Sequence, residues 1–347
     1  MAGVTILGTG AWGTTLARLL ADERLRCADG DASAAETVLL WEHHPERAAL
    51  MERKRVNQEY LPAMLFPPNL HVTADLAEAV FERELVLIVT PSQQVREQAK
   101  LAAPDLAPDA IVASASKGLE LGTRLRMSQV LKEELPDGVA IVALSGPNLA
   151  MEIARGLPAA AVVASGSPKA AERARKLLTA GMFRVYTSDD LPGVELGGAL
   201  KNIIALGVGI SDGLGYGENA KAAFMTRALA EISRLALAAG ANPLTLAGLA
   251  GLGDLIATCS SPLSRNRTLG LELAKGRPLD EVLAERKTVA EGVTTTRAAL
   301  ELASALCVEL PITEQIARVL FEQRDVKEAV RSLMLRDPKH ELHGLNE

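Results

Sequence analysis

The chain is poor in aromatic residues, in cysteine and in net positive charge. Phe, Trp and Tyr make up 3% of its 347 residues, so its cores must be built from Ala, Leu, Val and Ile within a hydrophobic share of 48%. Length and composition suit two domains of ordinary size. The net charge of −6 argues against nucleic acid as the main partner, because binding a phosphate backbone needs a basic surface.

The placement of cysteine and histidine and the length of the apolar runs argue against a disulfide-bonded, a metal-binding and a membrane-spanning protein. Cys27, Cys259 and Cys307 form no C-x-x-C pair, which is typical of reduced thiols in a cytoplasmic protein. No signal peptide is recognisable, and no run reaches the roughly 18 apolar residues of a membrane-spanning helix. The side chains of His43 and His44 are expected to diverge, and no cluster has metal-ligand spacing. We therefore expect a cytoplasmic protein with no metal and no integral membrane segment.

The first half of the sequence alternates strand and helix patterns. Seven runs have the composition of strands: Val4–Leu7, Thr37–Trp41, Leu85–Val89, Ile111–Ala115, Val139–Leu144, Ala160–Ala164 and Phe183–Thr187. Continuous apolar strands alternating with helices predict an α/β fold with a doubly wound, mostly parallel sheet covered on both faces. The polar segment Leu25–Glu36 is interpreted as a surface insertion.

After Leu191-Pro192-Gly193 no convincing strand follows. Four long Ala/Leu-rich stretches predict helices: Val194–Ile210, Glu218–Ala239, Glu291–Leu306 and Thr313–Gln323. We expect a dinucleotide-binding domain over residues 1–190, an all-helical domain over 191–336 and a polar tail over 337–347.

A glycine loop directly follows the first strand. The run Gly8-Thr9-Gly10-Ala11-Trp12-Gly13 leads into a helical pattern over Thr14–Asp22. In this strand–turn–helix context, Gly8 permits a tight turn, Gly10 lets a pyrophosphate approach the backbone, and Gly13 lets the helix pack closely. Phosphates would meet the N–H groups of the helix start. The alternative is a glycine turn that only shapes a strand–helix corner.

Small, polar and cationic groups follow the other predicted strands. They are Glu42-His43-His44, Thr90-Pro91-Ser92, Ser116-Lys117-Gly118 and Ser145-Gly146-Pro147-Asn148. Because parallel strands end at one edge of a sheet, these groups should gather where such folds bind ligands. Lys117 is either part of that site or an ordinary surface lysine.

A second lysine, Lys201, stands among small and aliphatic residues in a helix that contains Gly197, Gly198, Gly207 and Gly209. The glycines suggest that something packs very closely there, because each costs about 1 kcal/mol relative to alanine in a helix. Burial would lower the pKa of the lysine toward the range of proton transfer. The equal alternative is a lysine whose amine reaches water.

A third cluster combines Gly251-Leu252-Gly253-Asp254 with Ser264-Arg265-Asn266. The guanidinium of an arginine suits a phosphate, and serine and asparagine could add donors. A solvated loop at a helix start is the competing interpretation.

Several motifs in order resemble the bacterial-type NAD(P)-dependent glycerol-3-phosphate dehydrogenases. They are the glycine loop with Thr14, Ala115-Ser116-Lys117-Gly118-Leu119-Glu120, Leu144-Ser145-Gly146-Pro147-Asn148-Leu149-Ala150, Leu200-Lys201-Asn202, Gly251-Leu252-Gly253-Asp254-Leu255, Ser264-Arg265-Asn266 and Val289-Ala290-Glu291-Gly292. The resemblance implies a Rossmann-type domain followed by a helical domain of the 6-phosphogluconate-dehydrogenase-like class. It also implies reversible reduction of dihydroxyacetone phosphate to sn-glycerol 3-phosphate for phospholipid synthesis, in a cytoplasmic enzyme that could be a homodimer.

The resemblance also assigns roles to residues. Lys201 is the implied proton donor and acceptor, with Lys117 and Asp254 as the other catalytic residues. The implied substrate contacts are Lys117, Gly146, Asn148, Lys201, Asp254, Ser264, Arg265 and Asn266. The implied cofactor contacts are Gly8, Gly10, Ala11, Trp12, Gly13, His43, Lys117, Ala150, Arg265, Val289 and Glu291.

The end of the second strand bears on the choice between NAD and NADP. His43 stands where the family often carries a residue that contacts the 2′-phosphate of NADP, whereas Glu42 could accept hydrogen bonds from the ribose of NAD. We expect NADPH to be slightly favoured. The alternatives in function are a related two-domain dehydrogenase acting on another small acid or sugar, and a non-catalytic module that senses NAD(P)H.

Overall fold

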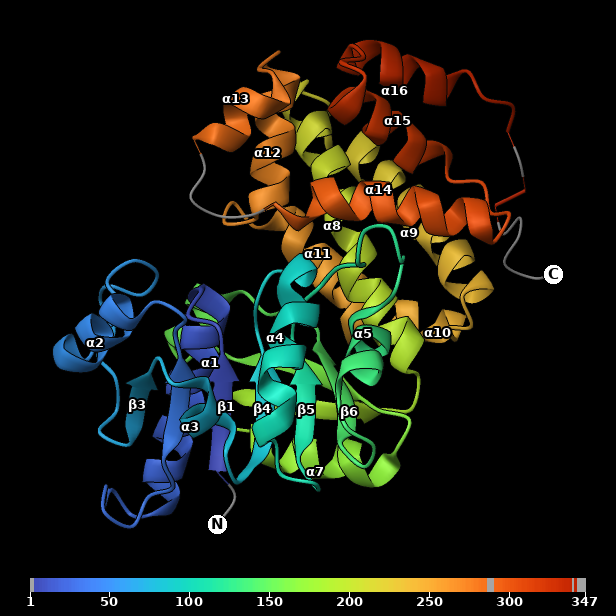
Figure 1. Cartoon of the computed structure of the whole chain (residues 1–347). Helices are drawn as coiled ribbons and strands as arrows, with labels where there is room; N and C mark the ends of the chain where they lie inside the picture. Colours follow the sequence, from blue (N-terminus) through green and yellow to red (C-terminus); the bar gives the residue numbers. More distant parts are fainter. Residues whose placement is uncertain (1–2, 286–289, 339, 342–347) are drawn as a thin grey trace. The chain divides into compact units, whose positions relative to one another are not determined.

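The structure is a computed structural model that describes residues 3–285, 290–338 and 340–341. The chain divides into two compact units (Figure 1). The first comprises Met1–Ser116 and Met127–Leu191, and the second comprises Lys117–Arg126 and Pro192–Glu347. The segment Lys117–Arg126 thus belongs with the second unit, which the single boundary expected at residue 190 did not foresee.

The first unit is built on one sheet of eight strands in the order β3-β2-β1-β4-β5-β6-β7-β8. The strands are β1 (Gly3–Leu7), β2 (Val38–Trp41), β3 (Leu70–Thr73), β4 (Arg83–Ile88), β5 (Ile111–Ser114), β6 (Ala140–Ser145), β7 (Ala159–Ala164) and β8 (Phe183–Ser188). The seven expected strands are confirmed with small shifts at their ends. The eighth, β3, was not expected; it is a short edge strand in which buried and exposed residues alternate.

All neighbouring strands are parallel except β6 and β7. Because Leu7 pairs with both Trp41 and Ile88, the loops after β1, β2 and β4 leave the sheet at the same edge. The expected doubly wound, mostly parallel sheet is therefore confirmed, and so is the gathering of its loops.

Helices cover this sheet. They are α1 (Ala11–Cys27), α2 (Pro45–Lys54), α3 (Leu76–Val80), α4 (Val95–Ala102), α5 (Met127–Glu134), α6 (Ala150–Ala154) and α7 (Pro168–Leu178), with short 3-10 turns at Ser92–Gln94 and Ala103–Asp105. Helices α4 and α5 lie in front of the strands in Figure 1, and α1 packs against α6. Helix α1 runs beyond the expected end at Asp22, so only residues 28–36 of the expected insertion form surface turns.

In the second unit the structure shows helices and no named strand among the described residues. They are α8 (Leu191–Gly213), α9 (Glu218–Ala238), α10 (Pro243–Leu246), a π-helical turn (Leu249–Gly253), α11 (Asp254–Ser260), α12 (Arg265–Ala274), α13 (Leu279–Ala284), α14 (Glu291–Ala305), α15 (Pro311–Phe321) and α16 (Val326–Met334). The four expected helices correspond to α8, α9, α14 and α15. The shorter helices were not expected.

Helix α8 is the central helix of the second unit, and its glycines explain how its neighbours approach. A Cβ on Gly209 would lie 2.0 Å from the carbonyl oxygen of Arg267, and one on Gly270 would lie 2.1 Å from that of Leu206. Helices α8 and α12 therefore meet backbone to backbone. A Cβ on Gly207 would strike the ring of Phe224. The close packing expected around these glycines is confirmed.

Two stretches of the described residues, Leu191–Gly213 and Pro243–Ser260, are long and apolar enough to cross a membrane by length and composition alone. Neither stretch is an uninterrupted apolar run in the sequence, because charged residues such as Lys201 and Asp254 stand within them. In the first stretch, 94% of the 18-residue window is buried inside the protein, as in the core helix of a soluble protein, which passes the same test. Burial inside the second unit thus accounts for its apolar character.

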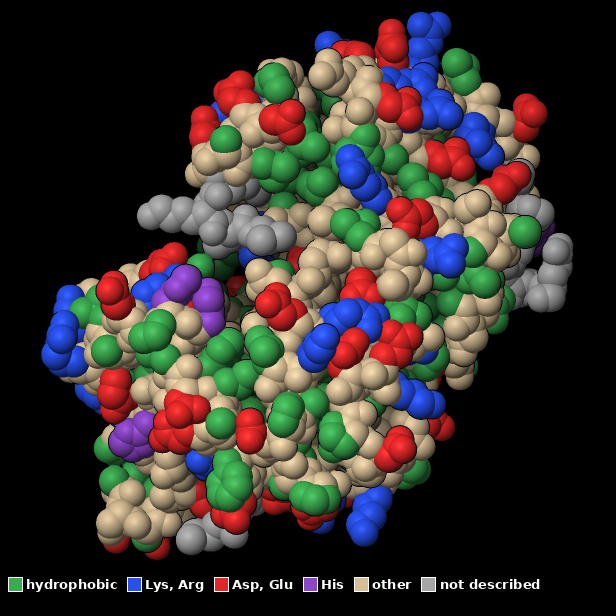
Figure 2. Space-filling model, viewed as in Figure 1, with side chains coloured by type: hydrophobic (Ala, Val, Ile, Leu, Met, Phe, Trp, Pro, Cys, Tyr) green, Lys and Arg blue, Asp and Glu red, His purple; other side chains and the backbone are tan. Residues whose placement is uncertain are grey.

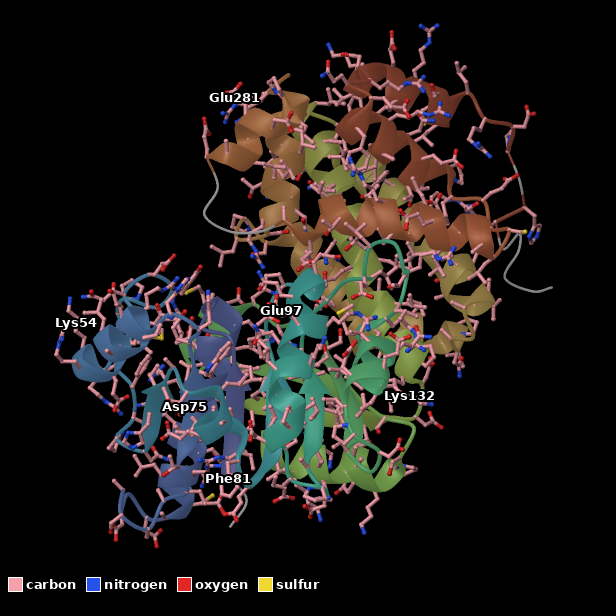
Figure 3. All side chains as sticks on the ribbon, in the orientation of Figure 1. Lys54, Asp75, Phe81, Glu97, Lys132 and Glu281 are labelled. Atoms are coloured by element: carbon pink, nitrogen blue, oxygen red, sulfur yellow. The ribbon has the colours of Figure 1, made fainter. Side chains whose placement is uncertain are left out.

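Charged side chains of both signs are interspersed over the face shown in Figure 2. Of the side chains labelled in Figure 3, Lys54 on α2, Glu97 on α4, Lys132 on α5 and Glu281 on α13 are exposed. Asp75 caps α3 by accepting a hydrogen bond from the backbone N–H of Glu78.

Candidate active site

Two lysines meet on one buried carboxylate in the second unit. Lys117 Nζ donates to Asp254 Oδ2 over 2.6 Å, and Lys201 Nζ donates to Asp254 Oδ1. Asp254 is only 1% exposed. The structure therefore brings together the three residues to which catalytic roles were assigned. The alternative of Lys117 as an ordinary surface lysine does not fit this contact.

Lys201 is 6% exposed, which decides between the two interpretations of this residue in favour of a buried amine. Its ammonium also donates to the hydroxyl of Thr258 over 2.7 Å. Burial lowers the pKa of Lys201 to about 8, while the negative charge of Asp254 acts in the opposite direction and the positive charge of Lys117 lowers the pKa further. Lys201 can therefore exchange a proton near neutral pH.

A π-helical turn immediately before α11 brings Asp254 to the lysines. Such turns are rare and often occur at functional sites. Within it, a Cβ on Gly251 would lie 2.0 Å from the carbonyl oxygen of Leu246. On the other side, a Cβ on Gly197 of α8 would lie 2.8 Å from the carbonyl oxygen of Ala250. Glycine at both positions lets the turn lie against α8, the helix that carries Lys201.

Thr258 was missed by the sequence analysis. It lies four residues after Asp254 on α11, so both side chains share one face of that helix. This spacing from a candidate carboxylate was the available signal.

A second polar cluster lies at the start of α12. Asn266 Nδ2 donates to Asn202 Oδ1 over 2.9 Å, and the backbone N–H of Gly292 donates to Asn266 Oδ1 over 3.0 Å. Asn202 follows Lys201 directly on α8, so this cluster fixes α12 and α14 beside the lysine-bearing helix. Asn202 was not among the expected site residues.

The other residues at the start of α12 differ in their hydrogen bonds and in their exposure. Ser264 is the N-cap of α12 and accepts a hydrogen bond from the backbone N–H of Arg267. Arg265 is exposed at the first position of α12. Arg267 Nη2 lies 2.6 Å from Asp212 Oδ2, and the two side chains form an ion pair.

In the first unit, the glycine loop has the geometry that its spacing predicted. Gly8 has φ +120°, and a Cβ there would lie 2.6 Å from the carbonyl oxygen of Val89. A Cβ on Gly13 would lie 2.0 Å from the carbonyl oxygen of Gly8. At Gly10, the N-cap of α1, a Cβ would meet nothing within 4 Å. The loop is thus tight at two glycines and open at the third, which fits a dinucleotide pyrophosphate at the start of α1.

Two further expected residues of the first unit carry buried polar atoms with no hydrogen-bond partner among the described residues. They are Asn148, through both its side-chain nitrogen and oxygen, and Trp12, through its indole nitrogen. Buried polar groups are nearly always hydrogen-bonded, so these atoms fit residues whose partner is a ligand. Gly146, at φ +135°, follows β6, and the carbonyl oxygen of Ala150, at the start of α6, accepts from Thr15.

The residues after β2 depart from expectation. The rings of His43 and His44 do not diverge, because their centroids lie 3.8 Å apart. Ligand-type atoms of Glu42, His43 and His44 lie within 4.8 Å of one another, so a grouping with metal-ligand chemistry exists where none was expected. Glu42, in turn, is 1% exposed and hydrogen-bonded inside the protein, whereas His43 is 60% exposed.

The last expected cofactor contacts come from the second unit. Glu291 is the first residue of α14 and is partly buried. Val289 lies outside the described residues.

The second unit also contains a cavity of about 1100 Å³ that is unrelated to this chemistry. Its largely apolar lining comes from α8, α9, α15 and α16, and it includes neither of the two lysines nor Asp254. Large apolar pockets are the usual first guess for an active site. Here the convergence of charged, buried groups is the stronger criterion, because it contains an amine whose pKa is lowered to about 8.

Known proteins resemble the chain over nearly its whole length. Residues 3–171 match the family described as NAD-dependent glycerol-3-phosphate dehydrogenase N-terminus, and residues 190–331 match the corresponding C-terminus. A glycerol-3-phosphate dehydrogenase (NAD(P)+) of Dehalococcoides mccartyi is 51% identical over 99% of this chain and 94% of its own. One of Thermobifida fusca is 48% identical over 99% of this chain and 100% of its own.

Among solved structures, the crystal structure of glycerol-3-phosphate dehydrogenase from Coxiella burnetii superimposes with a TM-score of 0.88. It is 38% identical and covers 96% of this chain and 99% of its own.

Proposed function

Because the chain belongs to the NAD-dependent glycerol-3-phosphate dehydrogenase family, we propose that it catalyses the reversible reduction of dihydroxyacetone phosphate to sn-glycerol 3-phosphate with NAD(P)H. The product supplies the backbone of glycerophospholipids. The observation that carries the proposal is the pair of ammonium groups, Lys117 and Lys201, on the buried carboxylate of Asp254.

Reduction of the ketone adds a hydride to the carbonyl carbon and a proton to the carbonyl oxygen. The nicotinamide, when bound, supplies the hydride. Lys201 supplies the proton to the oxygen, and in the reverse reaction its neutral amine takes the proton from the alcohol. The nearby charge of Lys117 stabilises the negative charge that develops on that oxygen. Asp254 and Thr258 hold the amine of Lys201 in one orientation.

The phosphate of the substrate lies remote from the reacting carbon, so its binding can position the carbonyl. We assign that contact to Arg265, with Ser264, the N-cap of α12, and Asn266 on either side of it in the sequence. Gly146 and Asn148 of the first unit are the further proposed substrate contacts. The unpartnered amide of Asn148 supports this assignment.

The proposed cofactor domain comprises residues 1–190 without the excursion, as we call the segment Lys117–Arg126 that belongs with the second unit. Residues 191–336 are the proposed substrate domain. Gly8, Gly10, Ala11, Trp12 and Gly13 would hold the pyrophosphate region, and Ala150, Lys117, Arg265, Val289 and Glu291 would complete the cofactor contacts. His43 is exposed beside Arg47, whose Nη2 lies 3.6 Å from Glu42. Two cationic or protonatable groups at this position support a slight preference for NADPH, whose 2′-phosphate they could bind.

The enzyme is proposed to be a cytoplasmic homodimer. Met334 and Leu335 are large apolar residues that are 78% and 74% exposed at the end of α16, and a partner surface would cover them. Light scattering on the purified protein tests this: a mass of one chain would refute the dimer.

A steady-state assay with dihydroxyacetone phosphate, run separately with NADH and NADPH, tests the function. We expect turnover with both cofactors and a loss of about 100- to 10,000-fold in Lys201→Met. Cofactor binding, measured by calorimetry, should change little in that variant. Lys275→Met, which removes an exposed lysine paired with Glu272, is the matched control.

Two outcomes would point to the alternatives. Tight cofactor binding without oxidation of NAD(P)H across small phosphorylated ketones would favour a sensing module. Equal activity on dihydroxyacetone, which lacks the phosphate, would favour a dehydrogenase with another substrate, because it would make Arg265 unnecessary.

A further inference from the structure

A buried carboxylate lies under the glycine loop of the first unit and has no part in the chemistry described above. Glu42 directly follows β2 and is 1% exposed. A carboxylate at such a position is costly unless hydrogen bonds satisfy its oxygens. Its partners therefore indicate what the residue is for.

Both carboxylate oxygens accept hydrogen bonds from the protein. The hydroxyl of Thr9, inside the glycine loop, donates to Oε2. The backbone N–H of His44, which is the N-cap of α2, donates to Oε1 over 3.0 Å. The backbone N–H of Glu42 donates to the carbonyl oxygen of Thr73 on β3 over 3.0 Å. One residue thus joins the loop after β1, the end of β2 and the start of α2.

The same loop residue is held from a second direction. The carbonyl oxygen of Thr9 accepts from Asn57 Nδ2 over 2.8 Å and from the hydroxyl of Thr14 over 3.1 Å. Asn57 is 2% exposed and also donates to that hydroxyl. Gly8 and Gly10 on either side of Thr9 have no side chains, so Thr9 supplies the side-chain hydrogen bond of this part of the loop. The backbone N–H of Gly8 adds a bond to the carbonyl oxygen of Trp41 over 3.2 Å.

A carboxylate that binds the ribose hydroxyls of NAD must present its oxygens to the ligand. Glu42 presents neither, and the cation of Arg47 and the ring of His43 lie 3.6 Å and 3.0 Å from its oxygens. We propose that Glu42 is a positioning residue that clamps the glycine loop through Thr9, and that it sets the affinity for NADH and NADPH alike without discriminating between them. This inference depends on the proposed use of the loop for NAD(P)H.

The test compares Glu42→Ala, Glu42→Gln, Thr9→Val and the double variant Thr9→Val/Glu42→Ala. Dissociation constants for NADH and NADPH are measured by calorimetry, and kcat and KM with dihydroxyacetone phosphate. Thr9→Val leaves Glu42 paired with Arg47 and His43, so for this variant we expect the constants for both cofactors to rise about 10-fold or more and by the same factor, with kcat changed less than about 2-fold. Glu42→Ala should lose at least as much affinity for NADH. Glu42→Gln should recover much of the loss. Its amide oxygen can accept from the backbone N–H of His44, and its amide nitrogen can donate to the hydroxyl oxygen of Thr9.

Two further results would be specific to a clamp. The double variant should be no worse than its worse single parent, since both changes break one contact. In the cofactor-free protein, amide hydrogen exchange over residues 8–13 should be faster in Glu42→Ala than in the wild type. Glu172→Ala, which removes a half-exposed carboxylate paired with Arg175 on α7, is the control and should leave all constants unchanged.

Unchanged cofactor affinities in Thr9→Val beside a loss of NADH affinity in Glu42→Ala would overturn the proposal, because Glu42 would then act on the cofactor and not through Thr9. So would a loss of kcat with unchanged cofactor affinity, which a reduced fraction of folded protein would produce. The calorimetric and exchange measurements do not require turnover. An inactive wild type that binds NADPH would therefore refute the proposed reaction and leave the clamp testable.

Discussion

Replacing Asp254 by asparagine removes the carboxylate that two ammonium groups share and keeps the shape of the side chain. Asp254 raises the pKa of Lys201 against the larger effect of burial, and the result in the wild type is a pKa of about 8. Without the carboxylate, burial and Lys117 still lower the pKa of Lys201, and the charge and hydrogen bond of Asp254 no longer raise it. An opposite charge at this range is typically worth about 1 to 3 pH units.

The consequence for the rate can be worked out. At about pH 7.5, a pKa of about 8 leaves about three quarters of the Lys201 side chains protonated. A fall of 1 to 3 pH units reduces that fraction about 3- to 200-fold, and reduction of dihydroxyacetone phosphate should slow by the same factor. In the plot of kcat for reduction against pH, the decrease at high pH should shift to lower pH by about 1 to 3 units.

The assay follows NADPH absorbance across a pH series at saturating substrate for the wild type and Asp254→Asn. Removing one partner from a buried ion pair costs about 3 to 5 kcal/mol, so urea unfolding must show that the variant is folded at the assay temperature. Glu272→Gln, a carboxylate-to-amide change at an ion pair on α12 away from Lys201, is the control. If Asp254→Asn is folded and its kcat for reduction falls at the same pH as in the wild type, the view that Asp254 sets the proton affinity of Lys201 is refuted.

The remaining predictions concern proton transfer, packing and thiol reactivity. In the wild type, reductive kcat should be flat below about pH 8 and fall above it, while oxidation of glycerol 3-phosphate should rise through the same pH. The reason is the proposed role of Lys201, which is to donate the proton in one direction and accept it in the other. Two profiles of the same sign would contradict this role. Gly209→Ala should lower the free energy of unfolding by about 1 to 3 kcal/mol or more, since its Cβ would lie 2.0 Å from a backbone oxygen, and Gly166→Ala, with open space at its Cβ, should be near neutral in the same urea titration. Cys259 is buried and its pKa is raised to about 12, so brief alkylation of the native protein near neutral pH should modify only the two exposed cysteines, as counted by mass spectrometry; a third adduct without unfolding would show that the site opens.

Sequence patterns were sufficient for the sheet and the glycine loop because both depend on local information. A strand such as Leu85–Val89 is apolar throughout because it is buried on both sides, and the spacing of the three glycines follows from the turn between a strand and the helix directly after it. Strand β3 was missed because it is short and carries the exposed His71 in the middle. Helix α12 was missed because Ser264-Arg265-Asn266 has the composition of a loop although Ser264 caps a helix.

The environment of Lys201 could not be decided from local sequence. A buried amine and an amine that reaches water are both compatible with the residues around Lys201. The partner that decides between them, Asp254, lies 53 residues further along the chain. Similarly, the role of Glu42 depends on Thr9, 33 residues before it. A glutamate at the end of the second strand can be an acceptor for the ribose of NAD or, as we propose for Glu42, a buried residue that holds the glycine loop. Both have the same local sequence, and only tertiary contacts distinguish them.

The excursion at Lys117–Arg126 determines how this polypeptide can be dissected. Its residue Leu119 is 1% exposed and packs in the core of the helical unit, and Lys117 supplies one of the two cations on Asp254. A fragment that starts at Pro192 would have a cavity in its core where the side chain of Leu119 packs. Its Asp254 would keep Lys201 as a cationic partner and lack Lys117. Expressing the two units separately should thus yield a poorly soluble helical piece, and a synthetic peptide spanning residues 117–126 should rescue it.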